Sequence, residues 1–254
     1  MLFILSFHVY GTLWGGVFAG PDKPPEYSSE AWMDLEIYLF EIKQTTFYVK
    51  YISFLEMKDQ GPPIYFDPFW STYHIITGLE RKWHGGLKFY FDHFCRHVID
   101  QPDTLFGKAV FNGFFLEWSS ATSPVEKYSK KKSFSFTYAF FPQTDIISYL
   151  NSTPFFRHVL EGEITFSHSP LLFKLRAGYI RSMEIEKRGR YYPPGHHWYF
   201  YPEIEIFKVE NGKCLSFFLR YYLIMHRDKS LIIEHPAIKP QGLFFPGLKF
   251  TFSF

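Results

Sequence analysis

Apolar and polar side chains alternate one by one along most of this chain. Phe134, Phe136, Tyr138 and Phe140, for example, are separated from one another by small or polar residues. A period of two places successive side chains on opposite faces of a β-strand. Because no stretch has a comparable helical period, the pattern predicts an all-β protein whose strands each have one apolar and one polar face.

The alternating segments are longer than ordinary strands. They run for roughly 11–13 residues, whereas strands in globular proteins usually have about 5–6 residues and strands that cross a bilayer need about 9–11. We place twelve strands at 2–13, 31–43, 46–58, 71–83, 86–98, 108–119, 132–142, 156–167, 170–183, 197–208, 213–226 and 243–254. Their length and even number favour a closed antiparallel up-and-down transmembrane β-barrel over a soluble β-protein with long strands.

The composition supports this choice. Of the 254 residues 22% are aromatic, with 32 Phe and 18 Tyr. In a bilayer, lipid covers the apolar face of a barrel and aromatic residues form girdles at both interfaces. The net charge of +2 and the scattered Lys and Arg argue against nucleic-acid binding, and two Cys are too few for a disulfide framework.

The connections between the predicted strands alternate in length. Short turns are predicted at Gln44-Thr45, His84-Gly85, His168-Ser169 and Asn211-Gly212, and long connections at 14–30, 59–70, 99–107, 143–155, 184–196 and 227–242. Outer-membrane barrels have short periplasmic turns and long extracellular loops, so the alternation assigns the two ends of the barrel. Residues 120–131 are the exception, because they form a long connection on the periplasmic side.

The pattern as a whole resembles bacterial outer-membrane β-barrels. Gly247, Phe250, Phe252 and Phe254 are spaced as in the C-terminal signal by which such barrels are recognised for insertion. In architecture the chain resembles small monomeric twelve-stranded porins, such as the oligogalacturonate-specific type. The resemblance implies a location in the outer membrane of a Gram-negative bacterium, with both termini in the periplasm. It also implies contact with membrane lipids including outer-leaflet lipopolysaccharide, insertion by the barrel-assembly machinery, and passage of a small hydrophilic solute without a cofactor.

Residues 1–20 permit a second interpretation, as a signal peptide that ends near Val17 and Ala19. We favour a strand at 2–13, because no Lys or Arg precedes the apolar part of this segment and because the alternation of loop lengths requires a strand there. An export signal would then lie upstream of Met1, and residues 1–254 would form a single barrel domain.

If the apolar phase meets lipid, the opposite phase lines the lumen and collects the charges, because a Lys or Arg at the bilayer midplane costs about 2–4 kcal/mol. The predicted lumen-lining residues are Asp34, Glu36, Lys50, Glu80, Lys88, Asp92, Arg96, Glu161, Glu163, Lys174, Arg176, Glu203, Glu205, Arg220 and Lys249. The predicted turns place Glu161 opposite Arg176, Glu163 opposite Lys174, and Glu203 opposite Arg220. Acidic and basic residues would therefore face each other row by row across the lumen wall.

A mixed-charge wall permits two interpretations. One is a narrow pore for small hydrophilic solutes with little selectivity by sign, which predicts a porin. The other is a structural barrel plugged by long side chains. The aromatic residues in the lumen phase are Tyr38, Tyr48, Tyr90, Tyr199, Tyr201, Phe218 and Tyr222. The sequence leaves the two interpretations open.

The segment 92–97 (DHFCRH) indicates a different function. His93, Cys95 and His97 share the outward face near the predicted outer leaflet. This arrangement resembles outer-membrane lipid hydrolases, whose His-x-Ser motif faces lipid at that level; here Cys95 stands at the position of the Ser and Arg96 at that of an Asn. The resemblance implies that Cys95 is a nucleophile and His93 its base. No acidic residue that would orient the base can be identified, and a band of interfacial polar residues is the alternative.

Other polar clusters have simpler interpretations. Adjacent His196 and His197 point to opposite faces of a strand, so they are unsuited to one metal ion and no metal site is predicted. The basic run 127–132 is predicted to be a solvated loop, with contact to an acidic partner or to lipid headgroups as the alternative. Cys95 and Cys214 fall near opposite ends of the barrel, too far apart for a disulfide.

Overall fold

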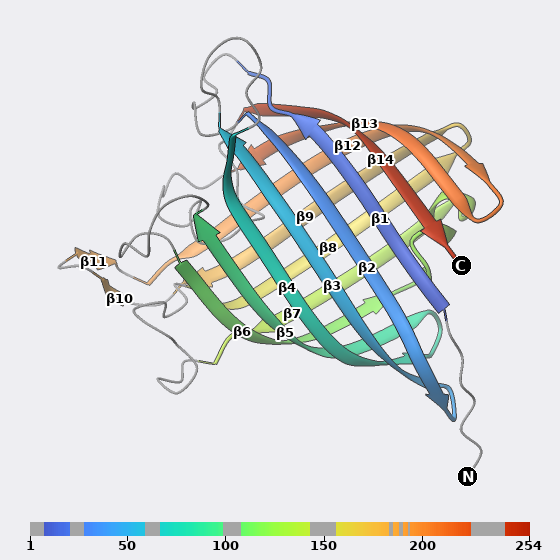
Figure 1. Ribbon diagram of the computed structural model, residues 1–254, viewed down its shortest axis with the longest axis horizontal. Helices are drawn as coiled ribbons and strands as arrows, with labels where there is room; N and C mark the ends of the chain where they lie inside the picture. Colours follow the sequence, from blue (N-terminus) through green and yellow to red (C-terminus); the bar gives the residue numbers. More distant parts are fainter. Residues whose placement is uncertain are drawn as a thin grey trace.

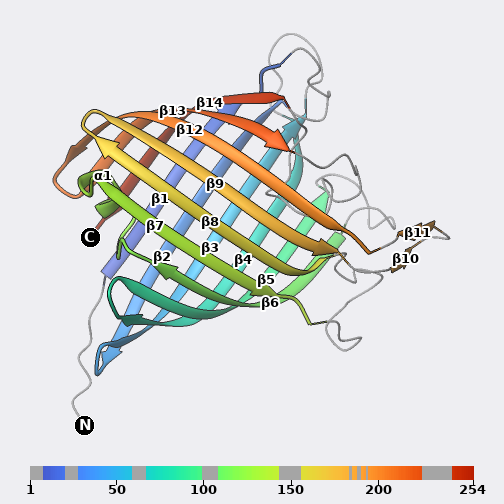
Figure 2. The same ribbon diagram turned by 180° about the vertical axis from the view of Figure 1, so that it is seen from behind.

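The computed structural model describes residues 8–20, 28–58, 67–98, 108–142, 156–182, 185–187, 190–192, 194–224 and 242–254. The strands of the main sheet are β1 (His8–Val17), β2 (Ser29–Ile42), β3 (Thr45–Lys58), β4 (Asp67–Lys82), β5 (Gly86–Val98), β6 (Lys108–Ser119), β7 (Lys132–Phe140), β8 (Phe156–His168), β9 (Leu171–Ser182), β12 (His196–Glu210), β13 (Lys213–Ile224) and β14 (Leu243–Ser253). They form a closed antiparallel barrel in the order β1-β14-β13-β12-β9-β8-β7-β6-β5-β4-β3-β2 (Figures 1 and 2). The predicted fold class is confirmed.

The barrel closes between the first and last strands. β1 pairs with β14 from Tyr10 opposite Ser253 to Gly16 opposite Gly247. The amide of Val9 also donates to the carbonyl of Phe254 at 3.0 Å. The first strand was predicted at 2–13, but it continues to Val17, and residues 2–7 lie outside the described part of the chain. Glycines at 11, 15 and 16 weaken the alternation there, which is why the pattern alone ended the strand too early.

The turn Asn211-Gly212 falls where it was predicted, whereas His84-Gly85 belongs to a three-residue loop, because Lys82 pairs with Gly86. Asn211 and Gly212 have φ values of 48° and 73°, as a type I′ turn requires, and His84-Gly85 also has positive φ values. The other two turns are displaced by one residue: the first is Lys43-Gln44 and the third is Ser169-Pro170. In the β8–β9 hairpin the displacement changes the pairing register by two residues and keeps the same face inward. In the β2–β3 hairpin a β-bulge between Tyr38 and Phe40 shifts the register by one further residue.

Neighbouring residues on one strand show the two faces of the wall. On β13, Phe217 is 50% exposed and Phe218 is 1% exposed, although they are adjacent and identical in type. Phe218 points into the barrel, where it packs on Phe245, and Phe217 points outward with Leu215 and Leu219. The exposed outer face is therefore apolar, as the bilayer requires.

Two long connections contain structure that the sequence pattern did not predict. Residues 126–129 form a single helical turn, α1 (Glu126–Ser129), at the end of the barrel that carries the short turns (Figure 2). β10 (Ile185–Lys187) and β11 (Arg190–Tyr192) form a separate two-stranded ribbon. The aromatic-rich connection at 59–70 lies largely outside the described residues, and its last four residues begin β4. In the described part of the chain, no helix is long and apolar enough to cross a bilayer.

Candidate functional site

The interior of the barrel contains a cavity of about 510 Å³. All of the predicted lumen-lining residues except Arg96 line it, and the side chain of Arg96 is outside the described part of the chain. The cavity also borders the rings of Tyr38, Tyr48, Tyr90, Phe218 and Tyr222. It is therefore narrowed by aromatic side chains as well as lined by charges.

The charges on the wall formed by β2 to β5 are paired. Lys50 contacts Asp34 at 2.7 Å. Lys88 bridges two carboxylates, because it contacts Glu36 directly and lies 4.0 Å from Glu80. These five groups lie on four adjacent strands, so the ion pairs tie the strands together inside the barrel.

A second network lies on β9, β12, β13 and β14. Glu203 accepts from Lys174 at 2.5 Å and from Arg220 at 2.6 Å, and Lys249 lies 3.7 Å from it. Glu205 contacts Lys249 and lies 3.4 Å from Lys174. The side chains of Glu203 and Glu205 are 1% and 0% exposed, so this network depends on its own partners rather than on water.

The pairing predicted across the β8–β9 hairpin is wrong by two residues. Glu163, not Glu161, lies opposite Arg176, and Lys174 lies opposite Thr165. Arg176 nevertheless contacts Glu161 diagonally at 3.0 Å and lies 3.8 Å from Glu163. Shifting a strand by two residues keeps the same face inward, so the hydrophobic pattern could not distinguish the two registers. The predicted pairing of Glu203 with Arg220 across the β12–β13 hairpin is correct.

The basic segment after residue 120 folds into the barrel end instead of extending into solvent. Lys127 contacts Glu163 at 2.9 Å. Tyr128 is buried, and its hydroxyl donates to Glu205 at 2.9 Å. Its backbone carbonyl accepts from the hydroxyl of Ser167 at 2.8 Å. The prediction of a solvated loop is therefore wrong for the first part of this run, while Lys131 and Lys132 are exposed.

Local hydrogen bonds hold the same segment in shape. Glu126 accepts from the amide and the hydroxyl of Thr122, at 2.5 and 2.8 Å, and contacts Lys130 at 2.7 Å. Burial raises the pKa of Glu126, but the hydrogen bonds from Lys130 and Thr122 outweigh it, and the pKa is lowered overall. Burial also raises the pKa of Tyr128, so its hydroxyl stays protonated as a donor. Residues 121–124, 127 and 128 line the cavity and form its floor at the short-turn end.

The C-terminal strand places its signal-like residues on both faces. A Cβ atom at Gly247 would lie 2.4 Å from the carbonyl oxygen of Gly15 and 2.7 Å from the ring of Phe218, so only glycine fits there. Phe250 and Phe252 lie on the outward face, and Phe254 is 68% exposed.

The most specific arrangement of reactive groups lies on the outer wall. His93 and Cys95 face outward on the second half of β5, away from the short turn at which that strand begins. Nδ1 of His93 lies 2.8 Å from Oδ1 of Asn112, which is directly opposite on β6. Because an amide oxygen only accepts hydrogen bonds, Nδ1 of His93 is the donor in this contact. In the neutral imidazole the lone pair is then on Nε2. Cys95 is two residues further along the same face and is not in a disulfide.

Sequence reasoning missed Asn112. The sequence identifies no orienting residue of acidic type, and the resemblance to outer-membrane lipid hydrolases places Arg96, the residue next to Cys95, at the position of an Asn. Asn112 is a polar residue in the outward phase of β6, and it stands between the apolar residues Val110 and Phe114. A polar residue in that phase was a visible signal, but its contact with His93 depends on the β5–β6 register.

The other candidate residues are not brought together. His196 is exposed and contacts Tyr179, whereas His197 is buried and lies 2.8 Å from the hydroxyl of Ser182. The side chain of His97 lies outside the described part of the chain. Among the described residues, no group of three or more His, Cys, Asp or Glu side chains is arranged to hold a metal ion.

Solved structures resemble this chain over nearly its whole length. Outer membrane phospholipase A from Escherichia coli has a TM-score of 0.54 and 7% identity, and the match covers 97% of this chain and 95% of that one. The outer membrane phospholipase dimer of Salmonella typhi, with bound calcium, has a TM-score of 0.55 and 7% identity, with 96% and 90% covered. The chain has the fold of bacterial outer-membrane barrels.

Other comparisons add little to this result. OccD3 of Pseudomonas aeruginosa matches with a TM-score of 0.37 and 8% identity, covering 98% of this chain and 91% of that one. A score at that level carries no argument about function. No family model and no curated protein sequence matches the chain. Since the identities are so low, the likeness concerns the fold alone, and any activity must be argued from the side chains of this chain.

Proposed function

We propose that this chain is an outer-membrane hydrolase that cleaves ester-linked acyl chains of membrane lipids. The observation that carries the proposal is the 2.8 Å contact between His93 Nδ1 and Asn112 Oδ1, with Cys95 beside His93 on the same outward face. A cysteine, a histidine and an asparagine in these roles form the catalytic group of papain-like proteases. The group recurs on unrelated folds, so it is recognised by geometry and not by sequence position.

Each residue has a defined role in the reaction. Nε2 of His93 takes the thiol proton of Cys95, and the sulfur attacks the ester carbonyl of the lipid. The leaving alcohol receives the proton from His93, and the acyl chain stays on Cys95 as a thioester. Water then hydrolyses the thioester, with His93 as the base. Asn112 is a positioning residue, because it holds the imidazole in the tautomer with Nε2 unprotonated.

The position of the group suits a lipid substrate. His93 and Cys95 are on the face that alternates with the charged lumen face, so they meet the bilayer and not the aqueous cavity. Lipid reaches this face by lateral diffusion, without passing through the barrel. In this proposal the end of the barrel that carries the long connections contacts lipopolysaccharide, and the termini face the periplasm. The barrel-assembly machinery recognises the C-terminal residues Gly247, Phe250, Phe252 and Phe254 when it inserts the chain.

The direct test is release of fatty acid from phosphatidylethanolamine in mixed micelles by the refolded protein. In a Cys214→Ala background Cys95 is the remaining thiol, and alkylation with iodoacetamide is expected to stop the release. Release that continues at the same rate after complete alkylation of Cys95 would contradict the proposal.

A second candidate function is passage of a small hydrophilic solute, and the internal cavity with its charged lining favours it. The floor formed by residues 121–128 opposes it. We expect a low single-channel conductance for the unchanged protein and a higher one for Lys127→Ala combined with Tyr128→Ala, because these side chains hold the floor to Glu163 and Glu205. Lys131→Ala, an exposed residue of the same segment, is the control and should leave the conductance unchanged. A baseline that stays closed in the double variant would remove the solute-passage candidate.

A further inference from the structure

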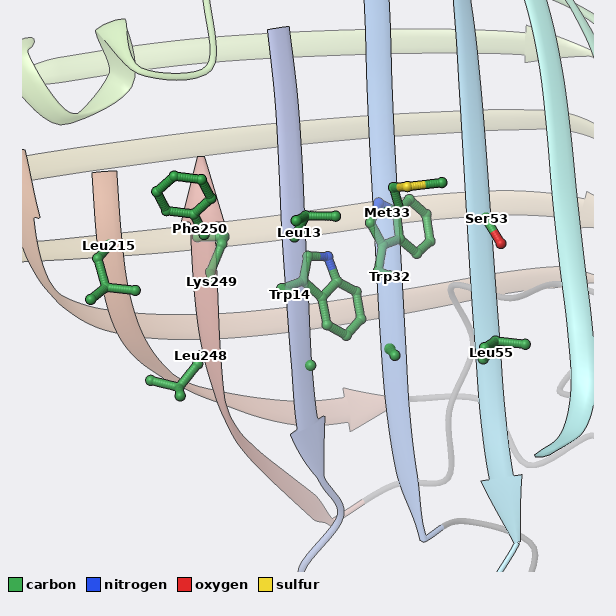
Figure 3. A pocket seen from close by; sticks show the side chains of 12 residues that line it. Leu13, Trp14, Trp32, Met33, Ser53, Leu55, Leu215, Leu248, Lys249 and Phe250 are labelled. Carbon is green, nitrogen blue, oxygen red and sulfur yellow. The ribbon is translucent and has the colours of Figure 1, made fainter. Parts of the chain in front are cut away.

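A groove of about 450 Å³ crosses the outer face of the barrel over β14, β1, β2 and β3 (Figure 3). Its floor contains two small residues, Gly15 and Ala31, which lie opposite each other on β1 and β2. Leu248 and Leu55 lie beside them on β14 and β3. The hollow exists because these two small residues are surrounded by larger apolar side chains, among them Leu13, Met33 and Leu248.

The groove is in register with Cys95. The residue opposite Cys95 on β4 is Tyr73, and the residue opposite Tyr73 on β3 is Ser53, which lines the groove. Ser53 is opposite Met33 on β2, and Met33 is opposite Leu13 on β1. One continuous row of outward side chains therefore leads from the thiol across Tyr73 into the groove. Figure 3 shows Leu13, Met33 and Ser53 on three neighbouring strands, β1, β2 and β3.

The length of this row fits one leaflet of a bilayer. Neighbouring strands are about 4.8 Å apart, so three spacings from Cys95 to Met33 give about 14 Å. The hydrocarbon core of a bilayer is about 30 Å thick, so the chains of one leaflet extend about 15 Å. An acyl chain whose carbonyl carbon lies at Cys95 therefore reaches into the groove.

We propose that this groove binds the acyl chain of the lipid whose ester Cys95 attacks, and that it makes the enzyme selective for long chains. The inference rests on the proposed hydrolase function, and it adds the site that chooses the substrate. Leu13, Met33, Leu55 and Leu248 supply an apolar lining. Because the surrounding lipid is as apolar as these side chains, the groove discriminates by how closely the acyl chain packs against its lining, and not by removal of methylene groups from water.

The first test fills the groove and compares chain lengths. Ala31→Trp and Ser53→Trp are expected to lower hydrolysis of a palmitoyl ester at least tenfold relative to a butyryl ester of the same alcohol. Ala177→Trp is the matched control, because Ala177 is an exposed outward-facing alanine on β9, and it should leave the ratio unchanged. An unchanged ratio in both groove variants, with hydrolysis intact, would overturn the groove proposal and leave the hydrolase.

The second test does not need activity. The unchanged protein is refolded in vesicles of phosphatidylethanolamine that carries a photoreactive diazirine in its acyl chain, and the labelled positions are mapped by mass spectrometry. Labelling at Leu13, Met33 and Ser53 is expected to exceed labelling around Ala177 several-fold. Preferential labelling of the groove without hydrolysis of either ester would keep the groove and remove the hydrolase. Labelling of the rest of the outer wall with protection of the groove would mean that a second copy covers it, and would overturn the proposal.

Discussion

Cys95→Ala is expected to abolish lipid hydrolysis. The thiol is the only nucleophile in the proposed group, so its removal leaves no path through a thioester. His93→Ala removes the base and should lower the rate by about 10²- to 10⁴-fold. The two losses should not add, because both residues serve the same proton transfer and attack.

Asn112 and Cys214 separate this chemistry from a general loss of folding. Asn112→Ala leaves both reacting groups in place but frees the imidazole, and a misplacement of this kind costs about 10²-fold. Asn112→Asp should restore part of the rate, because a carboxylate oxygen also accepts from Nδ1. Cys214→Ala is the control, since Cys214 is buried at the short-turn end of β13 and takes no part in the reaction.

The variants are compared by their initial rates of fatty-acid release. Each is first shown to be folded by the heat-modifiable gel mobility that is typical of outer-membrane barrels. If the folded Cys95→Ala variant released fatty acid at the same rate as the unchanged protein, the hydrolase proposal would be wrong. A defect shared equally by Cys95→Ala and Cys214→Ala would indicate damage to the fold instead of loss of a nucleophile.

Glu203→Gln is expected to lower the free energy of unfolding by about 3–5 kcal/mol, the usual cost of removing one partner from a buried ion pair. Glu203 is 1% exposed and contacts Lys174 and Arg220, with Lys249 at 3.7 Å. After the change, Lys174 and Lys249 keep their contacts with the carboxylate of Glu205, whereas Arg220 loses the carboxylate that its Nε contacts. The neutral amide compensates poorly for the lost charge.

The matched control is Glu210→Gln on the same strand. Glu210 pairs with Lys208 at 3.0 Å, but their side chains are 67% and 80% exposed, so the change should cost less than about 1 kcal/mol. Urea unfolding in lipid vesicles, followed by tryptophan fluorescence, compares the two variants. Equal stability of the two variants would mean that water reaches Glu203 and that the network does not hold β12 to its neighbours.

Two features of this barrel could not be derived from patterns along the chain. The inward fold of residues 120–131 depends on Lys127 and Tyr128 finding Glu163 and Glu205, which are distant in sequence. The contact of His93 with Asn112 joins two strands across a long connection, whose length does not define a register. Matching opposite charges also does not predict the register of the β8–β9 hairpin, because Lys174 contacts carboxylates on β12 and not on β8.

By itself the sequence determined that the wall has two faces, how many strands cross it, and which residues stand on each face. These properties follow from a period of two, which survives any shift of a strand by two residues, and from turn residues such as Asn211-Gly212. Only the tertiary structure decided the β8–β9 register, the floor of the cavity, the partner of His93 and the groove beside it. Each of these requires residues from different strands to meet, and the local pattern of a single strand does not specify which residues of the neighbouring strand lie opposite it.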